Sequence, residues 1–122
     1  MSWTSWVLGF VAGSVLASYV ALSCAPTRAQ SQEVSAAIHQ AASTYGVSEA
    51  WMRKIARCES SYLPWVTSRG GHMGLYQFHW RTYAWMSRQA GLAGTSPYDP
   101  WAAAEVAAWG LRNGFASHWA CA

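Results

Sequence analysis

The beginning of this chain carries no charge, and that feature most limits what the chain can fold into. Residues 1–27 contain no charged side chain, and residues 6–25 read WVLGFVAGSVLASYVALSCA, an apolar run of 20 residues. That length is just sufficient for a helix to span the hydrocarbon core of a bilayer. We therefore expect residues 1–29 to be a targeting or anchoring segment and residues 30–122 to form one folded domain.

Three interpretations of this segment remain open. A secretory signal peptide fits its position and the small residues Thr27 and Ala29, although no basic residue precedes the apolar run. An uncleaved anchor through residues 5–25 fits the length better, and Cys24 could instead carry a lipid. All three predict an exported domain, in the cell wall, the periplasm or the medium, that meets a membrane only through its N-terminal segment.

Composition limits the class of the remaining domain. Hydrophobic residues make up 52% of the 122 residues and charged residues only 11%, which excludes a disordered chain, a coiled coil and a charged nucleic-acid arm. The net charge of +3 is too small to indicate a nucleic-acid partner. Nine Trp and six Tyr are many for this length, and exposed aromatic rings stack on flat ligands such as bases or sugar rings.

The cysteines agree with export. Beyond the apolar segment only Cys58 and Cys121 remain. In an oxidising compartment we favour a disulfide between them over two buried free thiols, because such a crosslink adds roughly 2–4 kcal/mol to a small domain. The four histidines lack the spacing of zinc ligands, so we expect no metal and no cofactor.

Apolar spacing and capping residues predict a mostly α, small single domain. Glycine-, serine- and proline-rich stretches at 60–74 and 91–98 predict loops or a short hairpin. No alternating pattern predicts a set of strands. The expected helices cover residues 32–45, a segment from Ser48 through Cys58, residues 78–90, and a segment from Asp99-Pro100 to about Asn113.

One carboxylate stands apart from the other four in the domain. Asp99 and Glu49 suit helix starts and Glu33 opens the first helix, whereas Glu105 lies in mid-helix. Glu59 ends a helix, where the dipole disfavours negative charge, and aromatic residues follow it closely. A carboxyl desolvated by aromatic walls has a raised pKa and can act as a general acid in glycosidic cleavage. A surface Glu paired with a neighbouring arginine is the alternative, and composition alone would favour it.

Residues 59–82 read ESSYLPWVTSRGGHMGLYQFHWRT, and this stretch resembles the soluble lytic transglycosylase domain of the lysozyme superfamily. That family has Glu-Ser, then an aromatic residue, a Pro and a Ser at fixed offsets, a Gly, Gly-Leu-x-Gln, and later a Thr. The residues at matching offsets are Glu59-Ser60, Tyr62, Pro64, Ser68, Gly71, Gly74-Leu75, Gln77 and Thr82.

A second resemblance is to resuscitation-promoting factors, which are secreted and similar to transglycosylases. It rests on Cys58-Glu59-Ser60, Gly74-Leu75, Gln77-Phe78, and Trp119 before Cys121. In that family a disulfide joins the residue before the catalytic Glu to the C-terminal end, which implies pairing of Cys58 with Cys121. The chain has no clear Tyr-Asn-Ala-Gly motif in a later helix, and it has Ser61-Tyr62 where the resuscitation factors have Gly-Gly.

The resemblance implies a lysozyme-like fold and cleavage of peptidoglycan glycan strands by a monomer, with Glu59 as the catalytic acid. By family position Gln77, Ser60, Gly74 and Thr82 would lie at the substrate, and each has an ordinary structural role as its alternative. Aromatic side chains that could form a wall of the cleft are Tyr62, Tyr76 and Trp80, although at helical spacing such residues are more often part of a core.

The number of carboxylates bears on the reaction. Ordinary retaining and inverting glycosidases use two carboxylates, and the sequence has none between Glu59 and Asp99. The resemblance implies a lyase reaction in which the substrate's acetamido group assists and a 1,6-anhydromuramic product forms. Two other readings stay open: a phage endolysin or virion muramidase that acts by hydrolysis, and an inactive glycan-binding module on the same fold.

Overall fold

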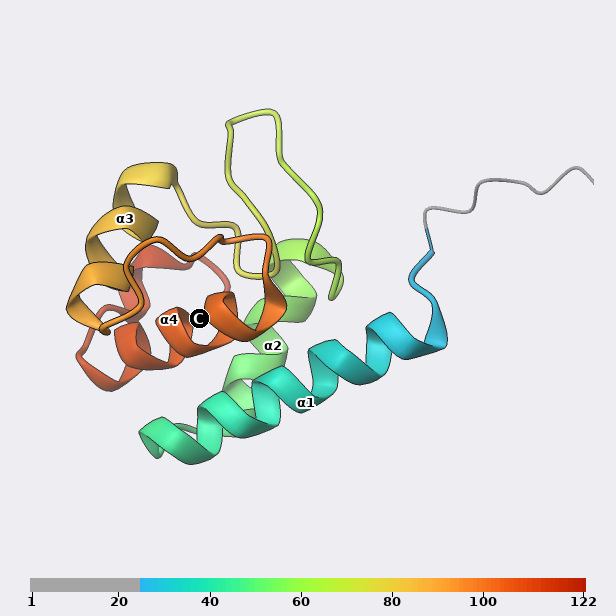
Figure 1. Ribbon diagram of the computed structural model, residues 1–122, viewed down its shortest axis with the longest axis horizontal. Coiled ribbons are helices and arrows are strands. Elements are labelled where there is room, and N and C mark those ends of the chain that lie inside the picture. Colours follow the sequence, from blue (N-terminus) through green and yellow to red (C-terminus); the bar gives the residue numbers. More distant parts are fainter. Residues whose placement is uncertain (1–24) are drawn as a thin grey trace, which may run out of the picture.

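The computed structural model describes residues 25–122, and these form a compact group of helices around one central helix (Figure 1). In the described residues there is no extended strand, only isolated bridges that pair Met73 with Thr67 and with Phe78. The prediction of a mostly α, small single domain is therefore confirmed. The elements in chain order are α1 (Arg28–Tyr45), α2 (Glu49–Ser60), α3 (Trp80–Gln89), α4 (Pro100–Arg112) and the short 3-10 helix η1 (Ala116–His118).

The first helix begins earlier than the sequence predicted. A capping box at Thr27 starts α1 at Arg28, four residues before the predicted start at 32. The Thr27 hydroxyl accepts the Gln30 N–H at 3.1 Å, and the Gln30 side-chain oxygen accepts the Thr27 N–H at 2.8 Å. The prediction began at the first apolar repeat and missed this polar turn. The division of the chain between residues 29 and 30 stays a prediction, and it falls inside the first turn of α1.

The predicted membrane or signal segment falls mainly on residues 1–24, which lie outside the described residues. Of the helices in residues 25–122, none has the length and the apolar character that a membrane crossing requires.

The starts of α2 and α4 agree with the capping residues seen in the sequence. Ser48 accepts the Trp51 N–H at 3.2 Å, and Asp99 accepts the Trp101 N–H at 3.0 Å with Pro100 as the first helical residue. The start of α3 was predicted two residues too early. Phe78 exchanges two backbone hydrogen bonds of 3.0 Å with Met73, and this pairing holds it out of the helix.

The core forms around α4, which α1 packs along and α3 also contacts (Figure 1). Small side chains on α4 allow this close approach, since most of its buried residues are alanines. Gly110 has a similar role, because a Cβ built there would lie 3.2 Å from the Trp119 ring. The buried residues of α4 are Ala102, Ala103, Ala104, Val106, Ala107, Ala108, Gly110 and Leu111.

A disulfide joins the end of α2 to the C-terminal segment. The Cα atoms of Cys58 and Cys121 are 6.0 Å apart, and 63 positions separate the two residues in the sequence. The crosslink therefore encloses the loop after α2, both later helices and η1. Inside this region the buried Trp119 ring makes edge contacts with Tyr76 and Phe78.

We expect the Cys58→Ser, Cys121→Ser double variant to lose roughly 4 kcal/mol of unfolding free energy, because a crosslink of this span removes much entropy from the unfolded chain. Urea unfolding of the variant and of the oxidised parent measures the difference. A reducing agent should destabilise the parent by a similar amount and leave the variant unchanged. Equal unfolding midpoints for variant and oxidised parent would contradict the expectation.

Candidate active site

Glu59 lies in the last turn of α2, at the point where the chain leaves the helix for the long loop of residues 61–79. Its side chain is half-buried, whereas the neighbouring Cys58 is exposed and Ser60 is buried. The carboxyl is therefore held at the boundary between core and solvent, next to the crosslinked position.

The surroundings of Glu59 favour its protonated form. Desolvation by burial raises the pKa of the Glu59 carboxyl above its ordinary value of about 4.5. A hydrogen bond with the backbone of Cys121 and the charge of His72 act in the opposite direction and are smaller. A raised pKa is what a general acid requires near neutral pH.

Ser60 fastens the end of α2 to the loop. The Ser60 hydroxyl oxygen lies 2.8 Å from the Leu75 carbonyl oxygen and 3.0 Å from the Ala56 carbonyl oxygen. Its one proton is shared between these two acceptors. Because Ser60 is buried, this contact leaves it no surface for a substrate. Its place is thus consistent with positioning Glu59 and not with binding a sugar directly.

Gly74 and Gln77 shape the far side of the loop. Gly74 has φ +74°, and a Cβ built there would lie 1.9 Å from the Pro97 carbonyl oxygen, so only glycine fits. Gln77 has φ +50°, and its side-chain amide donates to the Gly74 carbonyl at 2.9 Å and to the Val66 carbonyl at 3.3 Å. The amide nitrogen therefore closes the turn, and its oxygen makes no hydrogen bond within the described part of the chain.

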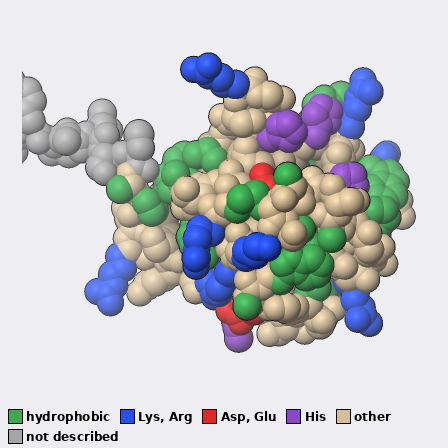
Figure 2. All heavy atoms as spheres, turned by 180° about the vertical axis from the view of Figure 1, so that it is seen from behind, with side chains coloured by type: hydrophobic (Ala, Val, Ile, Leu, Met, Phe, Trp, Pro, Cys, Tyr) green, Lys and Arg blue, Asp and Glu red, His purple; other side chains and the backbone are tan. Residues whose placement is uncertain are grey.

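The structure brings Gln77 and Thr82 together in one pocket of about 190 Å³. His72 also lines it, and the charge of His72 acts on the Glu59 carboxyl, which itself is not among the lining residues. Figure 2 shows histidine side chains gathered on the surface near an acidic side chain. The complete lining is His72, Gln77, Phe78, His79, Thr82, His118 and Trp119.

The sequence interpretation missed the histidines of this pocket. His72 falls in the 60–74 stretch that the sequence predicts as a loop, and no catalytic partner stands near it in the sequence. His118 lies 59 positions after Glu59, and only the fold places it at the same pocket as Gln77. His72 lies inside the 59–82 stretch but not at one of its matching offsets, and His118 lies far outside it, so the motif held no signal for either.

Of the three aromatic residues expected to form a wall of the cleft, one is wrongly assigned. Tyr76 is fully buried, and its hydroxyl donates to the Met52 carbonyl at 3.3 Å. Its ring contacts those of Phe78 and Trp119 and has no surface on which a sugar could stack. Gly74, Leu75 and Tyr76 are all buried, so this part of the loop lies in the core.

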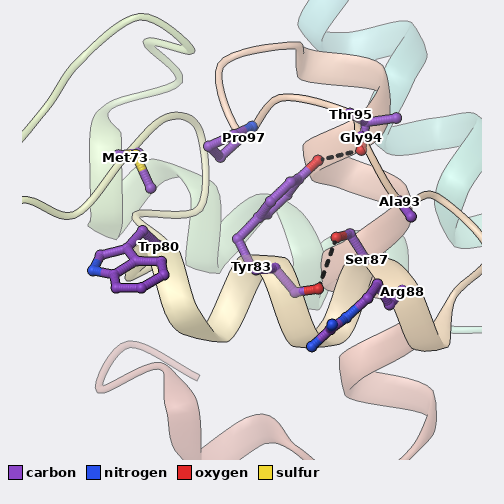
Figure 3. Close-up of a pocket in the computed structure, with 10 residues that line it drawn as sticks. Met73, Trp80, Tyr83, Ser87, Arg88, Ala93, Gly94, Thr95 and Pro97 are labelled. Carbon is purple, nitrogen blue, oxygen red and sulfur yellow. Dashed lines mark hydrogen bonds between the residues drawn. The ribbon is translucent and has the colours of Figure 1, made fainter.

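Trp80 and Tyr62 lie in two other pockets. Trp80 is 58% exposed at the edge of a pocket of about 580 Å³ between α3 and the 91–98 loop (Figure 3). Tyr83 crosses that pocket, and its hydroxyl is hydrogen-bonded to Thr95 at 2.8 Å. Tyr62 lies in a third pocket beside Arg53 and Arg57. The seven expected binding residues are thus divided among separate places.

The other carboxylates of the described residues are held elsewhere. Glu33 accepts the Trp101 indole N–H at 3.1 Å, and Glu49 forms ion pairs with His39 and Arg53. Asp99 caps α4, and the charge of Glu105 acts on Tyr45. Within residues 25–122 no group of three or more His, Cys, Asp or Glu side chains is placed to hold a metal ion.

A mostly helical domain with one half-buried glutamate at the end of its second helix is consistent with the lysozyme-like class of glycoside-cleaving domains. The family model for the transglycosylase SLT domain matches residues 36–118, which is more than half of the chain. The chain therefore belongs to the transglycosylase SLT family, whose activity is lytic cleavage of peptidoglycan. Comparison with curated proteins and with solved structures gave no match. The similarity to resuscitation-promoting factors stays a prediction.

The pKa of Glu59 has a consequence for stability. A carboxyl with a raised pKa binds its proton more tightly in the folded state, so stability falls as pH rises above about 4.5, and the loss is complete above the folded pKa. We expect Glu59→Gln to melt at a higher temperature than the parent at pH 7 and at the same temperature below about pH 4. Thermal melts across this pH range measure the difference.

Glu49 provides the matched control with the opposite sign. Hydrogen bonds from His39 and Arg53 lower the pKa of the Glu49 carboxyl, so its ionised form stabilises the fold at neutral pH. Glu49→Gln should therefore melt below the parent at pH 7. A lowered melting temperature for both variants at pH 7 would contradict the assigned environment of Glu59.

The glycines allow a separate test of the loop. Gly94 has φ +82° with nothing within 4 Å of a built Cβ, whereas at Gly74 the same atom collides with Pro97. We expect Gly94→Ala to lose about 1 kcal/mol for its backbone conformation alone. Gly74→Ala should lose at least about 2 kcal/mol more, because backbone atoms must move. Chemical unfolding of both variants measures the difference, and equal losses would show that the close approach to Pro97 is unimportant.

Proposed function

We propose that this protein is a lytic transglycosylase that cleaves the β-1,4 bond between N-acetylmuramic acid and N-acetylglucosamine with Glu59 as its single acid and base. The observation that carries this proposal is the isolation of Glu59. The charge of His72, which lines the pocket of Gln77 and Thr82, acts on its carboxyl. The other four carboxylates of the described residues have separate partners or positions. A reaction at this site therefore has one carboxyl group to use.

In the first step the protonated Glu59 carboxyl donates its proton to the glycosidic oxygen. The bond between that oxygen and C1 of the muramic residue breaks, and the N-acetylglucosamine end leaves as an alcohol. The acetamido oxygen of the muramic residue stabilises the cationic C1 from the opposite face, which replaces the second carboxylate of ordinary glycosidases. The raised pKa of Glu59 supports its role as proton donor.

In the second step the Glu59 carboxylate removes the proton from the 6-hydroxyl of the same muramic residue. The 6-oxygen bonds to C1, which closes a 1,6-anhydro ring, releases the acetamido group and restores the protonated acid. The proton that Glu59 donated stays on the leaving alcohol, the 6-hydroxyl proton replaces it on Glu59, and no water is consumed. Glu59 serves as acid and then as base, and its position at the edge of solvent suits both roles.

Substrate contacts are assigned from the pocket that His72, Gln77 and Thr82 line. The side-chain oxygen of Gln77 and the hydroxyl of Thr82 are the groups we assign to the glycan, because both line that pocket. We assign Ser60 and Gly74 to positioning, since one is buried and the other packs against Pro97. Trp80 offers an exposed ring for a sugar face at the start of α3.

We also propose that the protein is exported. The charge-free run of residues 6–25 supports this assignment, and so does the disulfide, which forms in oxidising compartments. Export would place the domain on the side of the membrane where peptidoglycan lies.

Mass spectrometry of the muropeptides released from purified peptidoglycan tests the reaction. The parent should release fragments with 1,6-anhydromuramic ends, and Glu59→Gln should reduce their rate of release by at least about a hundredfold, since an amide cannot supply the proton. Glu33→Gln is the matched control, because its amide oxygen can still accept the Trp101 indole N–H and it lies outside the pocket. It should retain the parent's rate.

Two other outcomes would replace the proposal. Glu59-dependent fragments with reducing ends would identify a hydrolase, as in the muramidase alternative. Binding of glycan without soluble products from either protein would identify a glycan-binding module on the same fold. Full activity of Glu59→Gln would contradict the role of Glu59 itself.

A further inference from the structure

A basic pocket lies apart from the catalytic site, between the first turns of α1 and the last turns of α2. Its volume is about 360 Å³. Arg57 lies 5.7 Å from the centroid of the Tyr62 ring and donates to the Tyr62 hydroxyl at 3.3 Å. The lining consists of two guanidinium groups, hydroxyl groups and one aromatic ring, with Val34 below them: Pro26, Ser31, Val34, Ser35, Arg53, Arg57, Ser61 and Tyr62. Guanidinium and hydroxyl donors of this kind suit a phosphate oxygen.

The positive charge at this pocket is only partly neutralised. Arg53 is tied to Glu49 by an ion pair of 2.6 Å and to the Ser35 hydroxyl at 3.0 Å. In the part of the chain that the structure describes, no carboxylate pairs with Arg57 or with the exposed Lys54 one turn before it. Arg28 opens α1 two residues after Pro26. Figure 2 shows basic side chains gathered on this face of the molecule.

The pocket also lies where the apolar segment joins the domain. Pro26 lines the pocket, and the apolar run ends at residue 25. If that run enters a bilayer, Pro26 lies at the headgroup layer. The pocket then lies at the same layer, because Pro26 is one of its lining residues. We propose that this pocket, with Arg57 at its centre and Arg28 and Lys54 beside it, docks the domain on a membrane by binding the phosphate of anionic lipid headgroups. The proposal rests on membrane anchoring and is independent of the cleavage reaction.

This docking would leave the catalytic residue accessible. An α-helix turns by about 100° per residue, so the side chains of Arg57 and Glu59 leave α2 about 160° apart. Arg57 and Glu59 therefore leave α2 on different sides, so a bilayer held at Arg57 does not lie directly over the carboxyl. The pocket of Gln77 and Thr82 shares no lining residue with the basic pocket, which agrees with this separation.

Hydrogen exchange of the full chain in lipid nanodiscs tests the proposal. We compare nanodiscs of phosphatidylcholine alone with nanodiscs that also contain phosphatidylglycerol. The anionic lipid should slow exchange at the start of α1 and at Ser61 and Tyr62, and high salt should remove this protection. Arg57→Gln should lower the docking equilibrium constant about fivefold, because each basic residue at an anionic surface contributes about that factor.

Arg112→Gln is the matched control. Arg57 and Arg112 each lie in the last turn of a helix, so both variants lose one charge and one favourable interaction with a helix dipole. Arg112→Gln should keep the lipid-dependent protection. Equal loss in both variants, or no difference between the two kinds of nanodisc, would overturn the proposal.

Two further measurements separate the alternatives. Equal protection by inorganic phosphate without lipid would identify a site for free anions, and protection by soluble anionic wall polymer alone would identify a wall partner; either result would overturn membrane docking. The release of soluble muropeptides is measured on the same samples. An active protein without lipid-dependent protection refutes docking alone, whereas an inactive but protected protein refutes the proposed reaction alone.

Discussion

Three consecutive residues hold the loop that faces Glu59, and each is fixed by a different segment of the chain. The Gly74 Cα lies against the Pro97 carbonyl of the loop before α4. The Leu75 carbonyl accepts the Ser60 hydroxyl at 2.8 Å, and the Tyr76 carbonyl accepts the Trp119 indole N–H at 2.9 Å. Because these contacts join α2, the 91–98 loop and the C-terminal segment, the shape of the whole site depends on them.

Opposing effects set the pKa of the Glu59 carboxyl. Burial raises its pKa, while the backbone of Cys121 and the charge of His72 hold the increase back. A carboxyl in the open would lose its proton too readily to act as an acid, and one deep in the core could not take a proton back from a substrate. The boundary position that the end of α2 provides lies between these limits. The destabilisation that results is of the kind that active sites commonly carry.

Sequence reasoning found the local features of this protein and missed those that depend on the fold. Ser48 and Asp99 identified two helix starts correctly, because a cap is a contact between near neighbours. Glu59, Gln77 and Thr82 belong to one motif, and the fixed offsets of that motif identified them as candidate site residues. Tyr76 was misplaced, and the histidines of the pocket were overlooked, because burial and long-range proximity are decided by packing between distant segments. The capping box of Thr27 and Gln30 is a local pattern that the sequence contains. The predicted helix start missed it because that prediction used apolar spacing alone.

The base of the loop after α2 is held by several contacts, whereas its tip is exposed, and this difference affects where the sequence can vary. Residues 74–76 are held from three sides, so an insertion there would shift every one of these contacts out of register at once. Residues 67–72 are exposed at the tip, and Gly71 has nothing within 4 Å of a built Cβ. Engineered insertions such as an affinity tag should therefore disturb the fold less at the tip than at its base. Divergence in substrate preference would then arise first in the tip, where the chain can change without rebuilding the site.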